Sequence, residues 1–349
     1  MFAARLICSW IGAFGLAAGA YCQTYVQINL CGIAPACAPY VRPMIINNAG
    51  TIAGDFSANP LGTSSFRNVG FVRHADGTWR TIGIPPASVG GTPTDMNAAG
   101  AVTGAYRDLL TLVIHGFVLD PAGKFLSFDV PGAFSTGPHS INAGGAVTGL
   151  WYYGSFSSPG PNHGFLRDAD GTITTFDVPE SIATVPGSIN AVGVITGAYQ
   201  TADGTYHGFV RDPAGYVTSF DPPGSTGTSP VSMNYSGAIT GSYTKADGRS
   251  YGFVRDADGT ITSFDPGFNT RAQSINSRGV ILGNYTNSTG NSVSSFVRSA
   301  DGTITLLLDQ PNFCPHGLGL ARSINEGGVI TGDCYVNQIV QSAGWVRYP

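Results

Sequence analysis

The chain has 349 residues, of which 42% are hydrophobic and only 11% are charged. So much apolar material excludes a disordered polypeptide, because it is enough to build a core. The net charge of −4, with no run of basic residues, excludes nucleic acid as a partner, since phosphate binding requires clustered Lys and Arg.

The first 20 residues have the pattern of a secretory signal peptide. Arg5 carries a positive charge, an apolar stretch runs from Leu6 to Ala17, and Ala18-Gly19-Ala20 is a cleavage site of the A-x-A type. The apolar stretch is too short to span a membrane, and no later stretch is long enough. We predict a signal peptide at 1–20, one domain at 21–349, and a secreted protein, extracellular or periplasmic.

A single strand with alternating apolar residues follows at residues 24–30, with the sequence TYVQINL. It stands before the first copy of a repeat that fills the rest of the chain. The repeat is clearest from Ser188 to Gly224, where I-N-x-x-G-x-I-T-G-x-Y is followed by H-G-F-V-R-D and then by T-S-F-D-P-P. The copies begin near residues 44, 94, 139, 187, 231, 273 and 322.

Each copy has the composition of four short strands. The segments VITGAY, HGFVRD and YVTSFD are rich in β-branched and aromatic residues. The N-x-x-G step fits a type I turn, D-A-D-G and D-P-A-G fit hairpin loops, and D-x-P ends the last strand. Four strands in about 46 residues, repeated in this way, predict an all-β fold: a seven-bladed β-propeller.

The last copy stops at Pro349, before its fourth strand. The strand at 24–30 can supply the missing one, so we predict that it closes the ring. Five cysteines outside the signal peptide lie near the two chain ends, namely Cys22, Cys31, Cys37, Cys314 and Cys334. In an oxidising compartment we expect pairing, with one cysteine left over. Either one bridge joins the two ends, or two local bridges form, Cys31–Cys37 and Cys314–Cys334.

The repeat resembles that of the HAF-repeat family of extracellular bacterial proteins. The resemblance rests on units such as Ser140-Ile141-Asn142 with His163-Gly164-Phe165, and Ser188-Ile189-Asn190 with His207-Gly208-Phe209, and it covers about residues 44–349. It implies secretion and a repeat architecture rather than an activity. The family's His is kept only at His115, His163 and His207, so a function that needs it in every blade is not expected.

The sequence holds no signature of a known catalytic site. It lacks a G-x-S-x-G elbow, an H-E-x-x-H step, a P-loop and a Rossmann fingerprint. We therefore assign no catalytic residues. The leading interpretation is a non-enzymatic binding or surface module, expected to be a monomer, with extracellular carbohydrate or protein as its partner. The alternative is a hydrolase or lyase acting on an extracellular polymer at the channel mouth.

The candidate ligand site lies at the residue pair before each I-N step. If I-N opens the innermost strand, these pairs surround the central channel, where propeller loops meet. Polar residues interrupt the pattern there at Asp95, His139, Gln273 and Arg322. An enzyme would use Asp95, His139 and Arg322 together.

A second candidate is the aromatic cluster Trp151, Tyr152 and Tyr153, followed by Phe156. Neighbouring side chains of a strand point to opposite faces, so these rings cannot all face inward. Exposed rings stack on sugars or dock protein chains.

No cofactor is expected, with Ca²⁺ as the one alternative. The D-A-D-G loops offer oxygen ligands at Asp168, Asp170, Asp256 and Asp258. They lack the further acidic ligands of a full site, so a simple hairpin turn is the competing interpretation. The aspartates of the F-D step, Asp129, Asp177, Asp221 and Asp265, are interpreted as turn formers before proline. His115, His163 and His207 lie a blade apart and are expected to have a structural role rather than to bind zinc.

Overall fold

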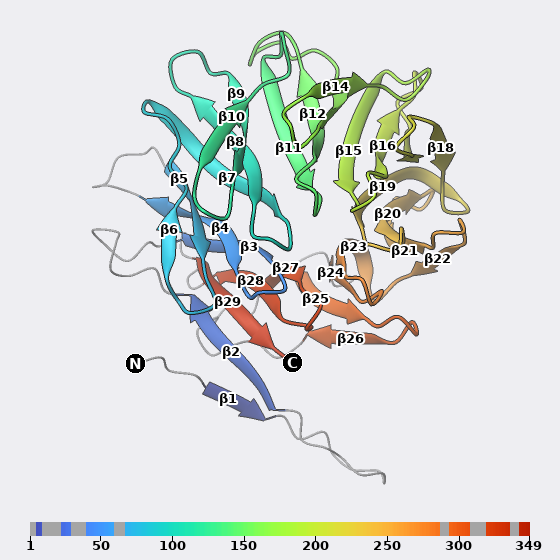
Figure 1. Ribbon diagram of the computed structural model, residues 1–349. Helices are drawn as coiled ribbons and strands as arrows, with labels where there is room; N and C mark the ends of the chain where they lie inside the picture. The colour runs from blue at the N-terminus through green and yellow to red at the C-terminus, as the bar shows by residue number, and fades with distance from the viewer. Residues whose placement is uncertain are drawn as a thin grey trace.

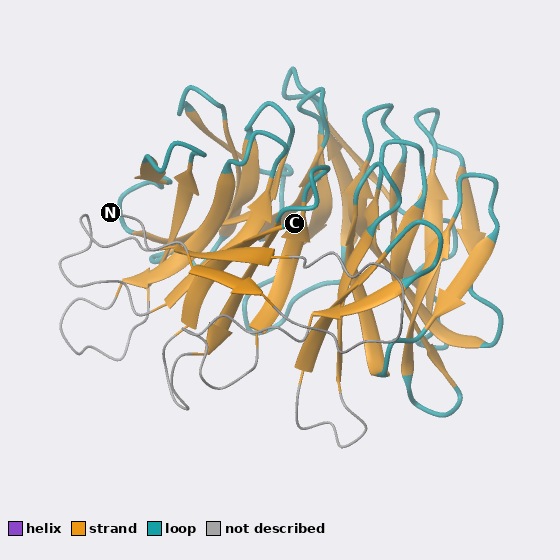
Figure 2. Cartoon of the chain, turned by 90° about the horizontal axis from the view of Figure 1, so that it is seen from below, coloured by secondary structure: helices purple, strands orange, loops and turns teal. Residues whose placement is uncertain are grey.

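The computed structural model describes residues 5–8, 22–28, 40–58, 67–286, 293–307, 319–335 and 342–349. All regular structure in this part of the chain is β-strand, joined by short turns (Figure 2). The all-β prediction is therefore confirmed. No helix in the described segments is long and apolar enough to cross a membrane.

The strands form a repeating unit of four antiparallel neighbours, and Figure 1 shows the units arranged around a common centre. The first strands face the centre and are β3 (Tyr40–Ile46), β7 (Ser88–Met96), β11 (Ser135–Ile141), β15 (Ala183–Ile189), β19 (Ser225–Met233), β23 (Phe268–Ile275) and β27 (Gly319–Ile324). The second strands are β4 (Ile52–Ala58), β8 (Val102–Asp108), β12 (Val147–Tyr152), β16 (Ile195–Gln200), β20 (Ile239–Lys245), β24 (Ile281–Thr286) and β28 (Ile330–Tyr335). The third strands are β5 (Arg67–Arg73), β9 (Ile114–Leu119), β13 (His163–Arg167), β17 (Tyr206–Arg211), β21 (Ser250–Arg255), β25 (Val293–Arg298) and β29 (Ser342–Tyr348). The fourth strands are β6 (Trp79–Thr81), β10 (Phe125–Phe128), β14 (Ile173–Phe176), β18 (Val217–Phe220), β22 (Ile261–Phe264) and β26 (Ile304–Leu307).

The N-terminal strand β2 (Cys22–Ile28) lies beside the last strand of the chain. It pairs antiparallel with β29, with Tyr25 opposite Arg347 and Val26 opposite Val346. The short strand β1 (Arg5–Cys8) pairs with the other edge of β2. The segment predicted to close the last unit is therefore in hydrogen-bonding contact with it.

The turn between the first and second strands is built by Asn and Gly, as the sequence predicts. In the unit of β15 and β16, Gly193 N–H donates to the Asn190 carbonyl, and Gly193 has φ +86°. The Asn190 carboxamide oxygen accepts from the N–H groups of Val192 and Val194. A positive φ strains any residue with a Cβ, so the fourth position of the turn is glycine.

A β-bulge interrupts the first strand of every unit, next to the second glycine of the repeat. In β15 the pairing with β16 shifts between Pro186 and Ser188, which leaves Gly187 as the extra residue. The facing Gly197 packs so tightly against β15 that a Cβ there would lie 2.7 Å from Pro186 Cα and closer still to the Val185 carbonyl oxygen. Such bulges re-aim side chains, which matters for the site described below.

The core is layered between units and centred on the Phe of the third strand. Phe209 is fully buried with Ile189 and Ile195, and Leu166 and Phe176 of the preceding unit pack against the same cluster. Arg211 places its guanidinium 4.7 Å from the Phe176 ring, a cation–π contact that other neighbouring units repeat. The H-G-F-V-R motif thus serves packing between neighbours.

The turn asparagines also connect the units to one another. Asn97 Nδ2 donates to the Asn142 carbonyl (3.1 Å), and Asn142 Nδ2 donates to the Asn190 carbonyl (3.1 Å). Asn325 Nδ2 donates to the Asn47 carbonyl (3.1 Å), so the last unit contacts the first. These carboxamides are buried, and a buried amide requires such partners.

Candidate functional site

A cavity of about 410 Å³ lies where the first strands meet, and the bulges build its wall. The extra residue of each bulge lines it: Met44, Thr94, His139, Gly187, Val231, Gln273 and Arg322. The residue that follows each of these also lines the cavity. The structure therefore brings together the residue pairs that the sequence placed around the channel, including Asp95, His139, Gln273 and Arg322.

Asp95 connects two units. Its Oδ2 accepts from Ser140 Oγ (2.8 Å) and from Ile141 N (2.9 Å), and its Oδ1 accepts from Met96 N (2.8 Å). Most other units have serine at this position, and Ser188 Oγ accepts in the same way from Met233 N (3.2 Å). Burial is the main influence on the Asp95 carboxyl and raises its pKa, while the three hydrogen bonds oppose this shift.

His139 lies in the bulge of β11. Its Nδ1 is 2.6 Å from the Pro186 carbonyl oxygen, which only accepts, so Nδ1 carries the hydrogen. Burial lowers the pKa of this imidazole below its usual value of 6.5. The ring is therefore neutral at pH 7, and its lone pair is on Nε2.

Gln273 and Arg322 differ in whether their polar side-chain atoms have partners. The Gln273 Oε1 atom is buried and has no hydrogen-bond partner. Arg322 makes a two-pronged ion pair with Asp333 of the neighbouring strand, Nε to Oδ1 at 2.6 Å and Nη2 to Oδ2 at 3.3 Å. No hydrogen bond or ion pair links Asp95, His139 and Arg322 to one another, all three being in the described part of the chain.

The aromatic cluster lies apart from the cavity, because Trp151, Tyr152 and Tyr153 are not among its lining residues. Trp151 and Tyr152 are half-buried, whereas Tyr153 is 50% exposed and Phe156 is 62% exposed. Arg107 of the preceding unit lies 5.9 Å from the Phe156 ring. The two rings within β12 (Trp151 and Tyr152) are half-buried, and the two beyond its end (Tyr153 and Phe156) are exposed.

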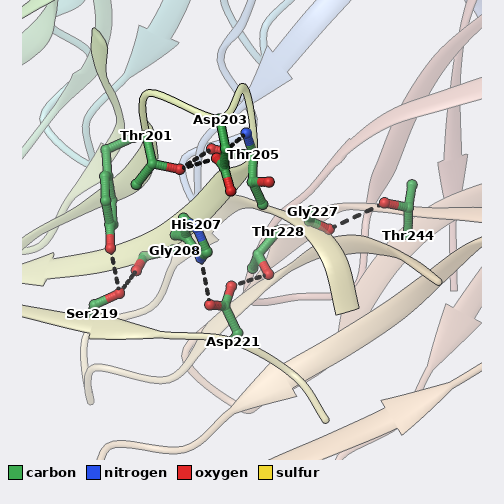
Figure 3. A network of polar contacts seen from close by, with 11 residues as sticks. Thr201, Asp203, Thr205, His207, Gly208, Ser219, Asp221, Gly227, Thr228 and Thr244 are labelled. Atoms are coloured by element: carbon green, nitrogen blue, oxygen red, sulfur yellow. Dashed lines mark hydrogen bonds and ion pairs between the residues drawn. The ribbon is translucent and has the colours of Figure 1, made fainter. Parts of the chain in front are cut away.

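Three His–Asp pairs occupy consecutive units, and the sequence interpretation missed them. His207 Nδ1 lies 2.7 Å from Asp221 Oδ2 (Figure 3), and the equivalent pairs are His115 with Asp129 and His163 with Asp177, both at 2.9 Å. The F-D aspartates are therefore more than turn formers. The signal was present in the sequence as a constant spacing of 14 residues between each His and its Asp.

A buried threonine ties each F-D turn to the next unit, in one of two ways. Where valine follows the aspartate, the Val178 N–H donates to Thr184 Oγ1 (3.0 Å). Where proline follows, there is no N–H, and the Thr228 hydroxyl donates to the Asp221 carboxylate instead (Figure 3). A hydroxyl fits both cases because it donates and accepts.

In the loops proposed to bind Ca²⁺, the aspartates form hydrogen bonds within their own hairpin turns. Asp170 Oδ1 accepts from Thr172 N (2.8 Å), and Asp258 Oδ1 accepts from Thr260 N (2.8 Å). These backbone hydrogen bonds are the main cause that lowers the pKa of both carboxyls. Asp168 and Asp256 each begin the same hairpin turn through backbone contacts with Thr172 and Thr260. Within the described ranges, no group of three or more His, Cys, Asp or Glu side chains is placed to hold a metal ion.

The predicted cysteine pairing falls largely outside the described residues. Cys31, Cys37 and Cys314 are not among them. Cys22 begins β2, and Cys334 lies in β28, which pairs with β29. Cys334 is buried at 1% exposure. The choice between an end-to-end bridge and two local bridges stays a prediction.

Comparison with known proteins identifies the fold. No family model and no curated sequence matches the chain. Among solved structures, a streptogramin B lyase is 14% identical, with a TM-score of 0.58 over 93% of this chain and 97% of that chain. The virginiamycin B lyase from Staphylococcus aureus is 13% identical, with a TM-score of 0.59 over 94% and 99%. The β-propeller domain of the trilobed protease from Pyrococcus furiosus is 9% identical, with a TM-score of 0.60 over 88% and 95%. At these identities the likeness concerns the fold alone, and the chain has a β-propeller fold.

Proposed function

We propose that the chain is a secreted, seven-bladed propeller whose ring is closed by β2. The pairing of β2 with β29 and the hydrogen bond from Asn325 to Asn47 support closure between the chain ends. Cleavage of the predicted signal peptide would remove β1 and leave β2 in place. The H-G-F steps at His163 and His207 support membership of the HAF-repeat family.

We propose further that this propeller is a non-enzymatic binding module. The observation that carries the proposal is the central cavity, into which every unit contributes its bulged residue. The charged groups of its wall serve the fold: Asp95 holds two units together, and Arg322 is engaged by Asp333. A wall of this kind can select a ligand by shape and hydrogen bonding, yet it contains no linked acid, base and nucleophile.

The test uses a variant that fills the cavity. Val231 lines the cavity and is 41% exposed, so Val231→Trp adds bulk without touching the core. The matched control is Val192→Trp, at a 62% exposed residue that does not line the cavity. Labelled wild-type protein would be screened on a glycan array and in pull-downs of extracellular proteins. We expect binding that Val231→Trp abolishes and Val192→Trp preserves; equal binding by all three proteins would refute the cavity as the site.

The exposed aromatic rings are a second place for carbohydrate or protein to bind. Tyr153 and Phe156 are largely exposed, although Tyr153 stacks on His163 and Arg107 lies over the Phe156 ring, and exposed rings of this kind stack on sugars or dock apolar side chains. In the same screen, the double variant Tyr153→Ala/Phe156→Ala would reduce binding of an extended partner that reaches these two rings. The same affinity in the double variant and in the wild type would exclude these rings as a binding site.

An enzyme that acts on an extracellular polymer is the alternative. Its specific support is that Asp95, His139 and Arg322 line one cavity. It requires these groups to act on one substrate bond, which predicts product release from a polymer and loss of release in His139→Gln. Binding without turnover would favour the module over the enzyme.

A further inference from the structure

The central cavity contains a hydrogen-bond acceptor that the fold leaves unused. His139 donates from Nδ1 to the Pro186 carbonyl, so its tautomer is fixed by a group that can only accept. The neutral ring therefore has its lone pair on Nε2. Within the described residues, Nε2 makes no hydrogen bond. A ligand group that donates a hydrogen bond can satisfy this atom.

Gln273 adds a second unused polar group to the wall. Its Oε1 is buried without a partner, although buried amides are normally hydrogen-bonded. A hydroxyl is suited to this position because it both donates and accepts, and so satisfies a carboxamide through its oxygen or its nitrogen. The two residues belong to different units, and both line one cavity.

The charged groups of the wall are largely engaged by other residues of the fold. Arg322 is held by Asp333, so it offers little attraction to an anion. The Asp95 carboxylate accepts from Met96 N, Ser140 Oγ and Ile141 N, so three of its about four acceptor positions are used. An anion would lose its hydration on entering and gain no free counter-charge in return. A cation would meet only the buried Asp95 carboxyl, whose pKa is raised by burial and which is therefore more readily neutral.

The remaining wall mixes uncharged hydroxyl side chains with apolar ones, and the space is small. Pro186, Pro230 and Val231 present C–H surfaces between the polar groups. A volume of about 410 Å³ is near the lower end of small-molecule pockets. From these features we infer that the cavity binds a small uncharged molecule bearing hydroxyl groups, of monosaccharide size, through His139 Nε2 and the Gln273 carboxamide. This inference rests on the proposed function and names its ligand class.

Calorimetric titration of the full chain tests the class directly. The probes are neutral hexopyranoses and, for each, the uronic acid and the 2-amino sugar. We expect one or more neutral sugars to bind and their charged counterparts to bind at least about tenfold more weakly. We also expect Gln273→Leu and His139→Phe each to weaken binding about tenfold or more. The matched controls Gln200→Leu and His207→Phe, at residues that do not line the cavity, would keep the wild-type affinity.

The outcomes separate this inference from the proposed function. Equal or tighter binding of a charged sugar, or no binding of any neutral sugar up to about 10 mM, overturns the ligand class. Neutral-sugar binding that is unchanged in the folded cavity variants overturns the assignment to His139 and Gln273. The two variants are in different units, so one folded variant is sufficient for the test. In each case the Val231→Trp screen decides independently whether any ligand uses the cavity.

Discussion

Replacing Gly149 by alanine tests the link between the second glycine of the repeat and the bulge that carries His139. A Cβ on Gly149 would lie 2.8 Å from Pro138 Cα and closer still to the Gly137 carbonyl oxygen. Both are backbone atoms of β11, so no side chain can move aside, and the strand itself must shift. Overpacking of this kind costs about 1–3 kcal/mol. Alanine also restricts the unfolded chain, which returns about 0.4–1 kcal/mol.

We therefore expect Gly149→Ala to lower the free energy of unfolding by about 1–2 kcal/mol. The measurement is urea unfolding followed by circular dichroism, with the slope m checked to be unchanged. The matched control is Gly83→Ala, because an added Cβ there meets no atom within 4 Å. The control should be neutral or slightly stabilising. Equal stability of the two variants would show that the close approach of β12 to β11 does not constrain the bulge.

Three further predictions concern the core, the cavity and its ion pair. Phe209→Ala should destabilise the protein by about 3–5 kcal/mol, because the ring is fully buried, whereas Tyr216→Ala, at a 77% exposed ring, should change stability by less than about 0.5 kcal/mol in the same urea assay. Burial lowers the pKa of His139, so the unfolded state takes up a proton at a higher pH than the folded state does. The free energy of unfolding should therefore fall as the pH drops below 6.5, by at most about 1.4 kcal/mol per pH unit. Melting curves of His139→Gln should lack this loss. A parallel pH dependence in the two proteins would contradict the assignment. Asp333→Asn should cost about 1–3 kcal/mol through weakened hydrogen bonds to Arg322, and Arg322→Gln should recover part of that loss in a double-mutant cycle.

Most of the fold could be predicted from the sequence because turn-forming and core residue types recur in each unit. Asn190 and Gly193 mark a turn because each residue type has a property the turn requires, and the structure shows the hydrogen bond and the positive φ. Phe209 was found as part of a motif, and it is the fully buried centre of its unit. The residue pairs before I-N were placed around the centre by assuming that I-N opens the innermost strand. That assumption is wrong, because the Ile ends the strand, as Ile189 ends β15, but the pairs lie within the innermost strand and do line one cavity.

The roles of the cavity residues could not be predicted from the sequence. The extra residue of a bulge breaks the alternation of side chains, and the residue type at His139 does not indicate that a bulge occurs there. Proline directly before the bulge, as at Pro138 and Pro186, was the available signal. The partners of His139 and Asp95 come from neighbouring units, 47 and 45–46 residues away, so only the folded arrangement reveals them. The His207–Asp221 pair was detectable in principle, because its spacing recurs.

The bulge also creates a position in each unit at which the residue type varies, next to positions at which it recurs. Its extra residue has no partner across the ladder, so strand pairing does not restrict its side chain. The chain places glycine, valine and histidine at this position in otherwise similar units: Gly187, Val231 and His139. Each unit therefore supplies one position to the cavity wall whose side chain is not fixed by strand pairing. A protein built this way can acquire a new ligand by single substitutions at the bulge, one unit at a time, while the buried core of each unit is left unchanged.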